Sequence, residues 1–196
     1  MTDAPVTRSP TRPIVAMSIT AILLVAPGGC SYLEDTIGQL SAKTFTVKGC
    51  LQSAELDVPV NAVAIDACAD LLYVRAQNAR TPVAAADGII LQFTALEQLL
   101  QELEGGPVVL DVTSPRVTVT LFLNHTCPDS FASLEATAGT VTVTSLQTST
   151  GGDLRLSATV TITDTKSGDL ASPAVTIDID ASDSSYRPLR DYPVCP

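Results

Sequence analysis

The chain has 196 residues, of which 45% are hydrophobic and 16% are charged, and its formal net charge is −10 at pH 7. A surface this acidic repels the phosphates of nucleic acids, so the composition argues against a nucleic-acid partner. The chain has no tryptophan and only four Tyr and four Phe, which leaves few aromatic platforms for stacking against sugars.

The first element is an uncharged apolar run from Ile14 to Ala26. Its 13 residues match the apolar core of an export signal, whereas a helix that spans a bilayer needs about 20 residues. One aspartate and two arginines precede the run, so its flank is net positive, as expected for the cytoplasmic side. Pro27 and Gly28-Gly29 end the helix just before Cys30 and leave that peptide bond open to a protease.

The tetrapeptide Pro27-Gly28-Gly29-Cys30 resembles the lipobox that lipoprotein signal peptidase cleaves in bacterial lipoproteins. Gly29 and Cys30 match that pattern, and Pro27 stands where the family usually has leucine or another aliphatic residue. The resemblance implies a signal peptide over residues 1–29, acyl chains on Cys30, and the membrane as partner through this lipid anchor. Ser31, which follows the cysteine and is not Asp, implies export to the outer membrane. Two alternatives remain, namely an ordinary secretory signal with Cys30 as a free thiol and an uncleaved membrane anchor.

Cysteine usage also indicates export. Five cysteines cannot all pair in disulfides, so in an oxidising compartment one of them is expected to have another role. With Cys30 acylated, Cys50, Cys68, Cys127 and Cys195 are left for two disulfides. Three pairings are possible, and we favour Cys50 with Cys68 and Cys127 with Cys195, because each joins neighbouring or terminal segments. A zinc site is the rival use, but none of these cysteines has Cys-x-x-Cys spacing, so we predict no metal and no cofactor.

Residues 30–43 are small and polar with scattered Leu and Ile, and we interpret them as a tether from the lipid to a domain over residues 44–196. In that domain a two-residue period dominates. Between Asp153 and Thr163, apolar residues alternate with Arg, Ser and Thr, which predicts a strand with one buried face. A turn over 149–153 predicts a hairpin with the strand before it, and Pro173 is expected to open the last strand. Further strands are predicted at 45–51, 88–93, 108–112, 117–123, 141–143 and 175–179.

One helix interrupts the strands. Four leucines between Leu96 and Leu103 share one helical face, Thr94 to Glu97 matches a capping box, and Gly105 is a suitable end. We expect this helix to cover an edge or open end of a sheet, with a partner-binding face as the alternative. Residues 61–79 fit a helix or a strand, and we favour a strand.

These elements predict a mainly β fold, namely a two-sheet antiparallel β-sandwich with one short amphipathic helix. In its general pattern of strands and turns the domain resembles the β-sandwich domains of uncharacterised bacterial lipoproteins. This resemblance implies a domain of the cell envelope and does not imply a particular catalytic or binding activity.

Residues with catalytic chemistry are few. His125 is the only histidine, and it stands beside Asn124, Cys127 and Asp129 without a Gly-x-Ser-x-Gly motif, so we interpret it as a surface histidine. A group of carboxylates near the end of the chain departs from the EF-hand pattern and is interpreted as a solvated strand face without calcium. Its members are Asp178, Asp180 and Asp183. No catalytic residue is therefore predicted.

Two hypotheses for the function follow. The first is a lipid-anchored, noncatalytic envelope protein that acts as a spacer or docks to another envelope protein. The second is an envelope hydrolase whose acidic residues meet only in the fold. The second hypothesis requires a pocket that is lined by at least two of five candidate residues, and a structure shows whether such a pocket exists. The five candidates are Asp111, His125, Asp129, Asp178 and Asp180.

Overall fold

A computed structural model describes residues 36–148 and 152–181. The expectations for the signal peptide over 1–29, for the lipidation of Cys30, and for Asp183 and Cys195 concern residues outside these ranges. All statements about structure below refer to the described part of the chain.

The elements in this part are strands with one α-helix and one short 3-10 helix. The strands are β1 (Gly38–Val47), β2 (Leu51–Val60), β3 (Ala62–Cys68), β4 (Leu71–Gln77), β5 (Asp87–Thr94), β6 (Val108–Asp111), β7 (Val117–Leu123), β8 (Leu134–Leu146), β9 (Leu154–Asp164) and β10 (Asp169–Ala181). The helices are η1 (Val83–Ala85) and α1 (Leu96–Glu104). The predicted mainly β fold with one α-helix is confirmed.

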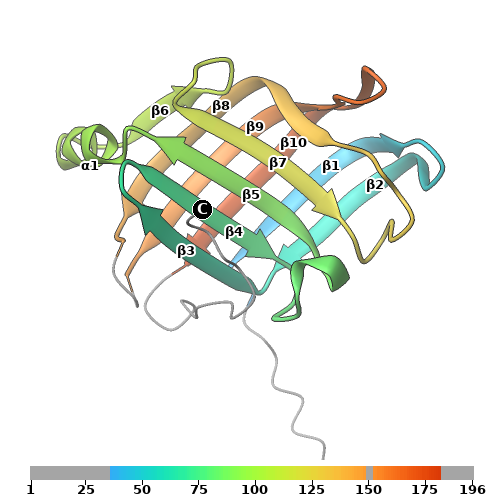
Figure 1. The fold of residues 1–196 in the computed structure, drawn as a ribbon, viewed down its shortest axis with the longest axis horizontal. Helices are drawn as coiled ribbons and strands as arrows, with labels where there is room; N and C mark the ends of the chain where they lie inside the picture. The colour runs from blue at the N-terminus through green and yellow to red at the C-terminus, as the bar shows by residue number, and fades with distance from the viewer. Residues whose placement is uncertain (1–35, 149–151, 182–196) are drawn as a thin grey trace, which may run out of the picture. The chain divides into compact units, whose positions relative to one another are not determined.

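All the described strands belong to one antiparallel sheet, in the order β2-β1-β10-β9-β8-β7-β5-β4-β3, with β6 paired beside β8. The sheet curls into a half-barrel, so that β3, β4, β5 and β7 cross over β8, β9, β10, β1 and β2 (Figure 1). Two separate sheets are not confirmed, because β7 and β8 still pair at Thr120↔Glu135 and Leu121↔Leu134. β7 and β8 pair over a short stretch only, and the two halves of the sheet separate beyond it.

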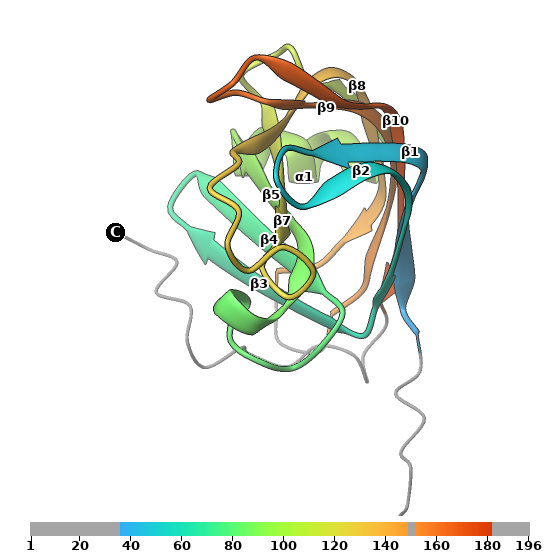
Figure 2. The same ribbon diagram turned by 90° about the vertical axis from the view of Figure 1, so that its right-hand side faces the viewer.

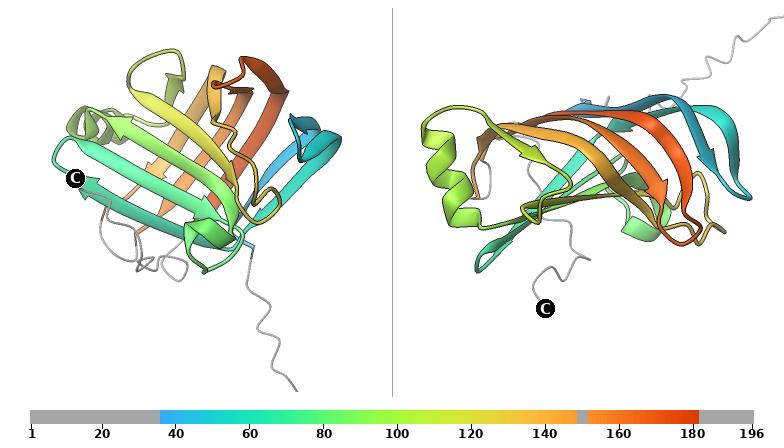
Figure 3. Two further views of the ribbon diagram at one scale, coloured as in Figure 1. Left: turned by 45° about the vertical axis from the view of Figure 1, so that its right-hand side comes forward. Right: turned by 90° about the horizontal axis from the view of Figure 1, so that it is seen from above.

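Register shifts in the longest strands accompany the curl. β8 shifts between Ala136 and Ala138, next to Gly139, whose φ is +111°. A Cβ at Gly139 would lie 2.2 Å from the Thr159 carbonyl oxygen, so only glycine fits here. Such irregularities bend a strand and increase its twist. The resulting curvature of β8, β9 and β10 is visible from above in Figure 3.

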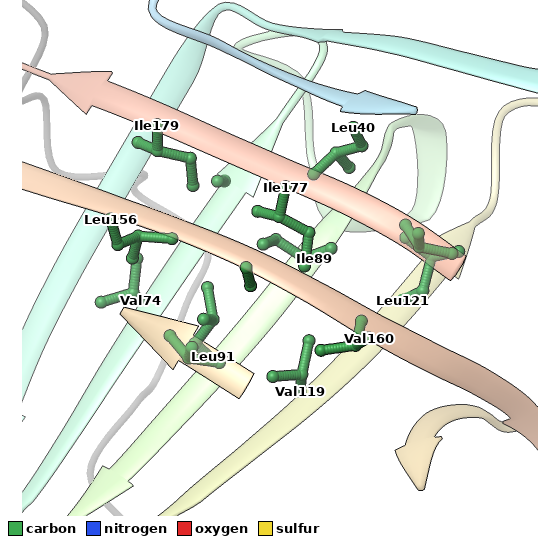
Figure 4. Packing of buried hydrophobic residues seen from close by; sticks show 14 of the residues in the cluster. Leu40, Val74, Ile89, Leu91, Val119, Leu121, Leu156, Val160, Ile177 and Ile179 are labelled. Carbon is green, nitrogen blue, oxygen red and sulfur yellow. The ribbon is translucent and has the colours of Figure 1, made fainter. Parts of the chain in front are cut away.

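The core lies between the two halves of the curled sheet (Figure 4). Apolar side chains from β1, β9 and β10 face those from β4, β5 and β7, and each is at most 3% exposed. The labelled members are Leu40, Leu156, Val160, Ile177 and Ile179 on one side, and Val74, Ile89, Leu91, Val119 and Leu121 on the other. The alternating pattern predicted for 153–163 thus gives one buried face of β9, and burying it stabilises the fold through the hydrophobic effect.

Helix α1 has the predicted apolar face of leucines, but its N-terminus lacks the predicted capping box. Leu96 and Leu99 are buried, and α1 packs against β6 and β8. The N-cap is Ala95, in the left-handed region at φ +53°, and it makes no side-chain capping bond. Thr94 belongs to β5 instead, and its hydroxyl donates to the Pro115 carbonyl at 2.9 Å. The Leu96 N–H donates to the Asp70 carbonyl in the β3–β4 turn, so a distant turn replaces the local cap.

Several element boundaries differ from those predicted. β1 begins at Gly38, so residues 38–43 of the expected tether belong to the sheet. The strand predicted at 45–51 is interrupted by a turn, after which β2 follows as a separate strand. β10 begins at Asp169, and Pro173 lies in a register shift where a ladder hydrogen bond is not required. Residues 61–79 form the β3–β4 hairpin, which confirms strand over helix.

Candidate functional site

Three strand connections gather at one side of the domain, and we call them the loop end. They are the β1–β2 turn (48–50), the β7–β8 loop (124–133) and the β9–β10 turn (165–168). Figure 2 looks onto the side of the domain that carries them. Their ties to one another, and the side chains they leave exposed, make this the best-defined candidate site in the described part of the chain.

A disulfide joins two of these connections. Cys50 is bonded to Cys127 with their Cα atoms 5.7 Å apart, across a sequence separation of 77. The favoured pairings of Cys50 with Cys68 and of Cys127 with Cys195 are therefore both wrong. Cys50 lies just before β2 and Cys68 ends β3, so two consecutive extended strands separate them although they are close in sequence. Cys68 is disulfide-bonded as well.

Asp87, a residue that the sequence analysis did not identify, holds the β7–β8 loop in place. Its carboxylate is 2% exposed and accepts hydrogen bonds from the backbone N–H groups of His125 (2.9 Å) and Thr126 (3.0 Å). The Thr126 hydroxyl donates a third bond at 2.6 Å. Buried carboxylates need such partners, and these bonds place the loop so that Cys127 meets Cys50. The only signal in the sequence is a single acidic residue directly before an apolar strand.

Asp164 ties the β7–β8 loop to the β9–β10 turn. Its carboxylate accepts bonds from the Ser133 N–H (3.0 Å), the Lys166 N–H (3.1 Å) and the Ser167 hydroxyl (3.0 Å). The backbone bond from Ser133 is the main cause that lowers the pKa of Asp164, with smaller help from Ser167 and Lys166 against the opposing effect of desolvation. The Lys166 ammonium donates to the Phe131 carbonyl at 2.7 Å, which adds a further tie between the two loops.

The loop end exposes apolar side chains beside lysines. Phe131 is 85% exposed and Leu170 is 55% exposed. Leu170 and Lys48 line a groove of about 360 Å³ between the β1–β2 and β9–β10 connections. Exposed Lys48 and Lys166 are two of the chain's three lysines, and they lie among Asp129, Asp164 and Asp169, so the loop end carries charges of both signs. Apolar side chains beside cations suit contact with another surface rather than proton transfer.

The five residues that the hydrolase hypothesis requires are spread over the domain. His125 and Asp129 are exposed in the β7–β8 loop. Asp178 and Asp180 lie on the exposed face of β10, where Asp180 pairs with Arg155 at 3.0 Å.

Asp111 lies apart from these acids, at the end of β6. Three strand spacings separate β6 from β10, roughly 14 Å in total. The Thr113 hydroxyl and N–H donate to the Asp111 carboxylate at 2.7 and 2.8 Å and lower its pKa. Three grooves among the described residues have linings that include none of the five residues.

The described residues contain neither a candidate metal-ion cluster nor a candidate membrane-spanning helix. Among them, no three His, Cys, Asp or Glu side chains are placed to hold a metal ion. No helix in that same part is long and apolar enough to cross a membrane.

The comparisons with known proteins assign no family. No family model, curated protein or solved structure matches the chain. Function must therefore be argued from the motif around Cys30 and from the geometry of the β domain.

Proposed function

We propose that this chain is a lipid-anchored protein of the bacterial cell envelope, in the outer membrane, whose β domain is a noncatalytic spacer or docking module. The observation that carries the proposal is the apolar run from Ile14 to Ala26 followed by Pro27-Gly28-Gly29-Cys30. The Cys50–Cys127 disulfide supports it, because disulfides persist in exported proteins and are rare in the reducing cytosol.

Chain connectivity gives the length of chain between the proposed anchor and the sheet. β1 begins at Gly38, eight residues after Cys30, so at most about 27 Å of extended chain separates them. From Gly38 the ten residues of β1 lead toward Lys48, which gives roughly 30 Å of strand. The loop end therefore lies at the opposite end of β1 from Gly38, the residue at which the chain that follows Cys30 enters the sheet.

The chemistry of the loop end indicates the kind of partner. Phe131 and Leu170 offer exposed apolar side chains, and the groove beside Leu170 is lined by Lys48 as well as by Asp164 and Asp169. We propose an envelope protein that presents apolar side chains with charges of both signs around them, including a carboxylate opposite Lys166. Complementary charges across such a contact would fix its register and select this partner over others.

The anchor is tested by mass spectrometry of protein extracted from membranes. The expected N-terminal residue is acylated Cys30, and Cys30→Ser should release the protein from the membrane fraction. Ser31→Asp is the matched control, because it should keep the acyl chains and change only which membrane retains the protein. An unmodified N-terminus elsewhere, or a native protein that is freely soluble, would overturn the anchor.

Docking is tested by site-specific photocrosslinking in intact cells. A photoreactive residue at position 131 should give one defined adduct that is lost in Lys166→Glu. The same residue at Val109, which is 62% exposed on β6 away from the loop end, is the control. Equal adducts from both positions, or an adduct indifferent to the charge reversal, would contradict docking through the loop end.

A further inference from the structure

Strands β1 and β10 pair along only part of their length. In the described part of the chain their ladder ends at Ser41↔Thr176, although both strands continue beyond this pair. β1 runs on to Val47 as a partner of β2, and β10 begins already at Asp169 as a partner of β9. The β1–β2 and β9–β10 hairpins therefore diverge beyond the ladder, and Figure 2 shows this separation.

A register shift in each strand accompanies the divergence. From Ala42 to Phe45 β1 advances three residues while β2 advances two, so β1 carries one extra residue there. From Ser172 to Val175 β10 advances three residues while β9 again advances two. Such bulges bend a strand and interrupt its ladder. The two bulges follow directly on the last β1–β10 pair, which accounts for the separation of the strands.

The space between the two hairpins is hollowed along its length. A groove of about 580 Å³ lies between residues 41–44 of β1 and residues 172–174 of β10. The groove of about 360 Å³ at the loop end follows it, between residues 46–48 and residues 169–170. We call the two grooves together the slot. It borders residues 42–47 of β1, which is roughly 20 Å of strand.

The β7–β8 loop fixes both hairpins and so opposes closure of the slot. The Cys50–Cys127 disulfide ties the β1–β2 turn to this loop. The Ser133 N–H, further along the same loop, donates to the Asp164 carboxylate at 3.0 Å and ties the β9–β10 hairpin to it. Because the hairpins are attached to different points of one loop, the β1–β10 ladder is hindered from extending toward the loop end.

The wall of the slot formed by β10 has its backbone groups largely satisfied. Pro173 has no N–H, and its carbonyl accepts a bond from the Thr161 hydroxyl at 2.9 Å. The Ser172 hydroxyl, on a residue only 1% exposed, accepts from the Ala174 N–H at 3.4 Å and donates to the Ala174 carbonyl at 3.3 Å. A further strand therefore finds little to pair with on β10.

The wall formed by β1 differs in this respect. The Asp180 N–H donates to the Ile37 carbonyl, so every second residue of β1 from Ile37 onward directs its backbone groups at β10. Lys43 is the next such position after Ser41, and the ladder has ended before it. Among the described residues no ladder partner meets Lys43 across the slot. An unpaired strand edge of this kind is a template for another extended chain.

We propose that the slot binds an extended peptide segment of the docking partner, which pairs with the edge of β1 as an added strand. This inference rests on the proposed docking function and specifies the form in which the partner is bound. Main-chain hydrogen bonds give affinity in this mode, and alternate side chains give specificity. Apolar Val47 and Leu170 line the slot together with charged Lys43 and Glu55. The slot therefore suits a peptide in which apolar and polar residues alternate.

A phage-displayed library of random ten-residue peptides, selected on the purified native protein, tests binding in the slot. Selected peptides should show the alternating pattern. Ala174→Trp should weaken their binding at least tenfold, because the indole fills the slot. Ser157→Trp is the matched control, since Ser157 is exposed on the same face of the sheet but does not line the slot, and it should leave binding unchanged. Failure to select a peptide, or equal binding to both variants, would overturn the proposal.

Backbone pairing is tested on the native protein with N-methylated forms of a selected peptide. Methyl groups on every second residue block one edge of an extended peptide, and moving them by one residue blocks the other edge. Binding should fall at least tenfold in one form and stay unchanged in the other, because only β1 offers free pairing groups. Equal affinities of the two forms would show that side chains alone hold the peptide, and would overturn an added strand.

Photocrosslinking in intact cells separates this inference from the proposed function. A photoreactive residue at position 43 should give an adduct with the same partner as one at position 131. An adduct at position 131 with none at position 43 would leave docking through the loop end and overturn the added strand. The absence of adducts at both positions would overturn both proposals.

Discussion

The carboxylate of Asp87 and the hydroxyl of Thr126 lie 2.6 Å apart, although the two residues are 39 positions apart in the sequence. Asp87 is the first residue of β5, a strand whose apolar residues are central to the core. Thr126 directly precedes Cys127, which carries the disulfide to Cys50. This contact therefore connects the loop end to the core.

Removal of the Asp87 carboxylate should destabilise the domain. Asp87→Ala leaves the N–H groups of His125 and Thr126 without their acceptor, and we expect a loss of about 2–4 kcal/mol in the free energy of unfolding. Urea denaturation followed by circular dichroism measures it. Asp129→Ala, in the same loop but exposed, should change stability by no more than about 0.5 kcal/mol. Similar losses in both variants would contradict the role assigned to Asp87.

Loss of the Cys50–Cys127 disulfide should have a comparable effect. The bond closes a loop of 77 residues, for which chain entropy gives a stabilisation of about 4.5 kcal/mol as an upper value. The double variant Cys50→Ser/Cys127→Ser should unfold at a lower urea concentration than the native protein. Each single variant should lose as much as the double variant, because either substitution breaks the same bond. Additive losses would show that the two cysteines act separately.

Gly139 should not tolerate a side chain. Gly139→Ala places a methyl group 2.2 Å from the Thr159 carbonyl oxygen at φ +111°, and we expect a loss of more than about 2 kcal/mol. Gly168→Ala is the matched control, since its φ is also positive, at +76°, but nothing lies within 4 Å. That variant should lose about 1 kcal/mol, from backbone strain alone. Equal melting temperatures for the two variants would exclude a steric role for the close approach to β9.

Asp164 should make the loop end sensitive to acid. Its pKa is lowered in the folded state, mainly by the Ser133 N–H, so the carboxylate stabilises the fold above its ordinary pKa of 3.8. That contribution is lost as the pH falls through the lowered value. The melting temperature of Asp164→Asn should lie below that of the native protein at pH 7 and approach it near pH 2. Asp169→Asn, in the same turn region, is the control, and a difference that persists in acid would refute the assignment.

Local patterns in the sequence predicted the elements that bury one continuous face. The alternation over 153–163 gave β9, and the leucine spacing from Leu96 to Leu103 gave α1. In both cases the residues of the buried face lie close together in the sequence, so their spacing within a short segment is enough to predict the element.

Other features depend on residues far apart in the chain, and the sequence did not reveal them. β2 carries Glu55, Asp57 and Pro59 between its apolar residues, a composition that suits a strand at the edge of a sheet and was not recognised as a strand. The bond between Cys50 and Cys127, like the contacts of Asp87 and Asp164, depends on which loops the curled sheet brings together. No local window contains that information.

The pairing of β1 with β10 has a consequence for how the chain folds. Gly38 lies opposite Ile179, so the first strand of the sheet finds one of its two neighbours only when the last strand has formed. Joining such distant segments costs loop-closure entropy before any contact compensates for it. The domain should therefore fold slowly for its size, with a rate limited by this final juxtaposition, and a chain shortened before Asp169 should leave β1 without that neighbour and fail to reach the native state.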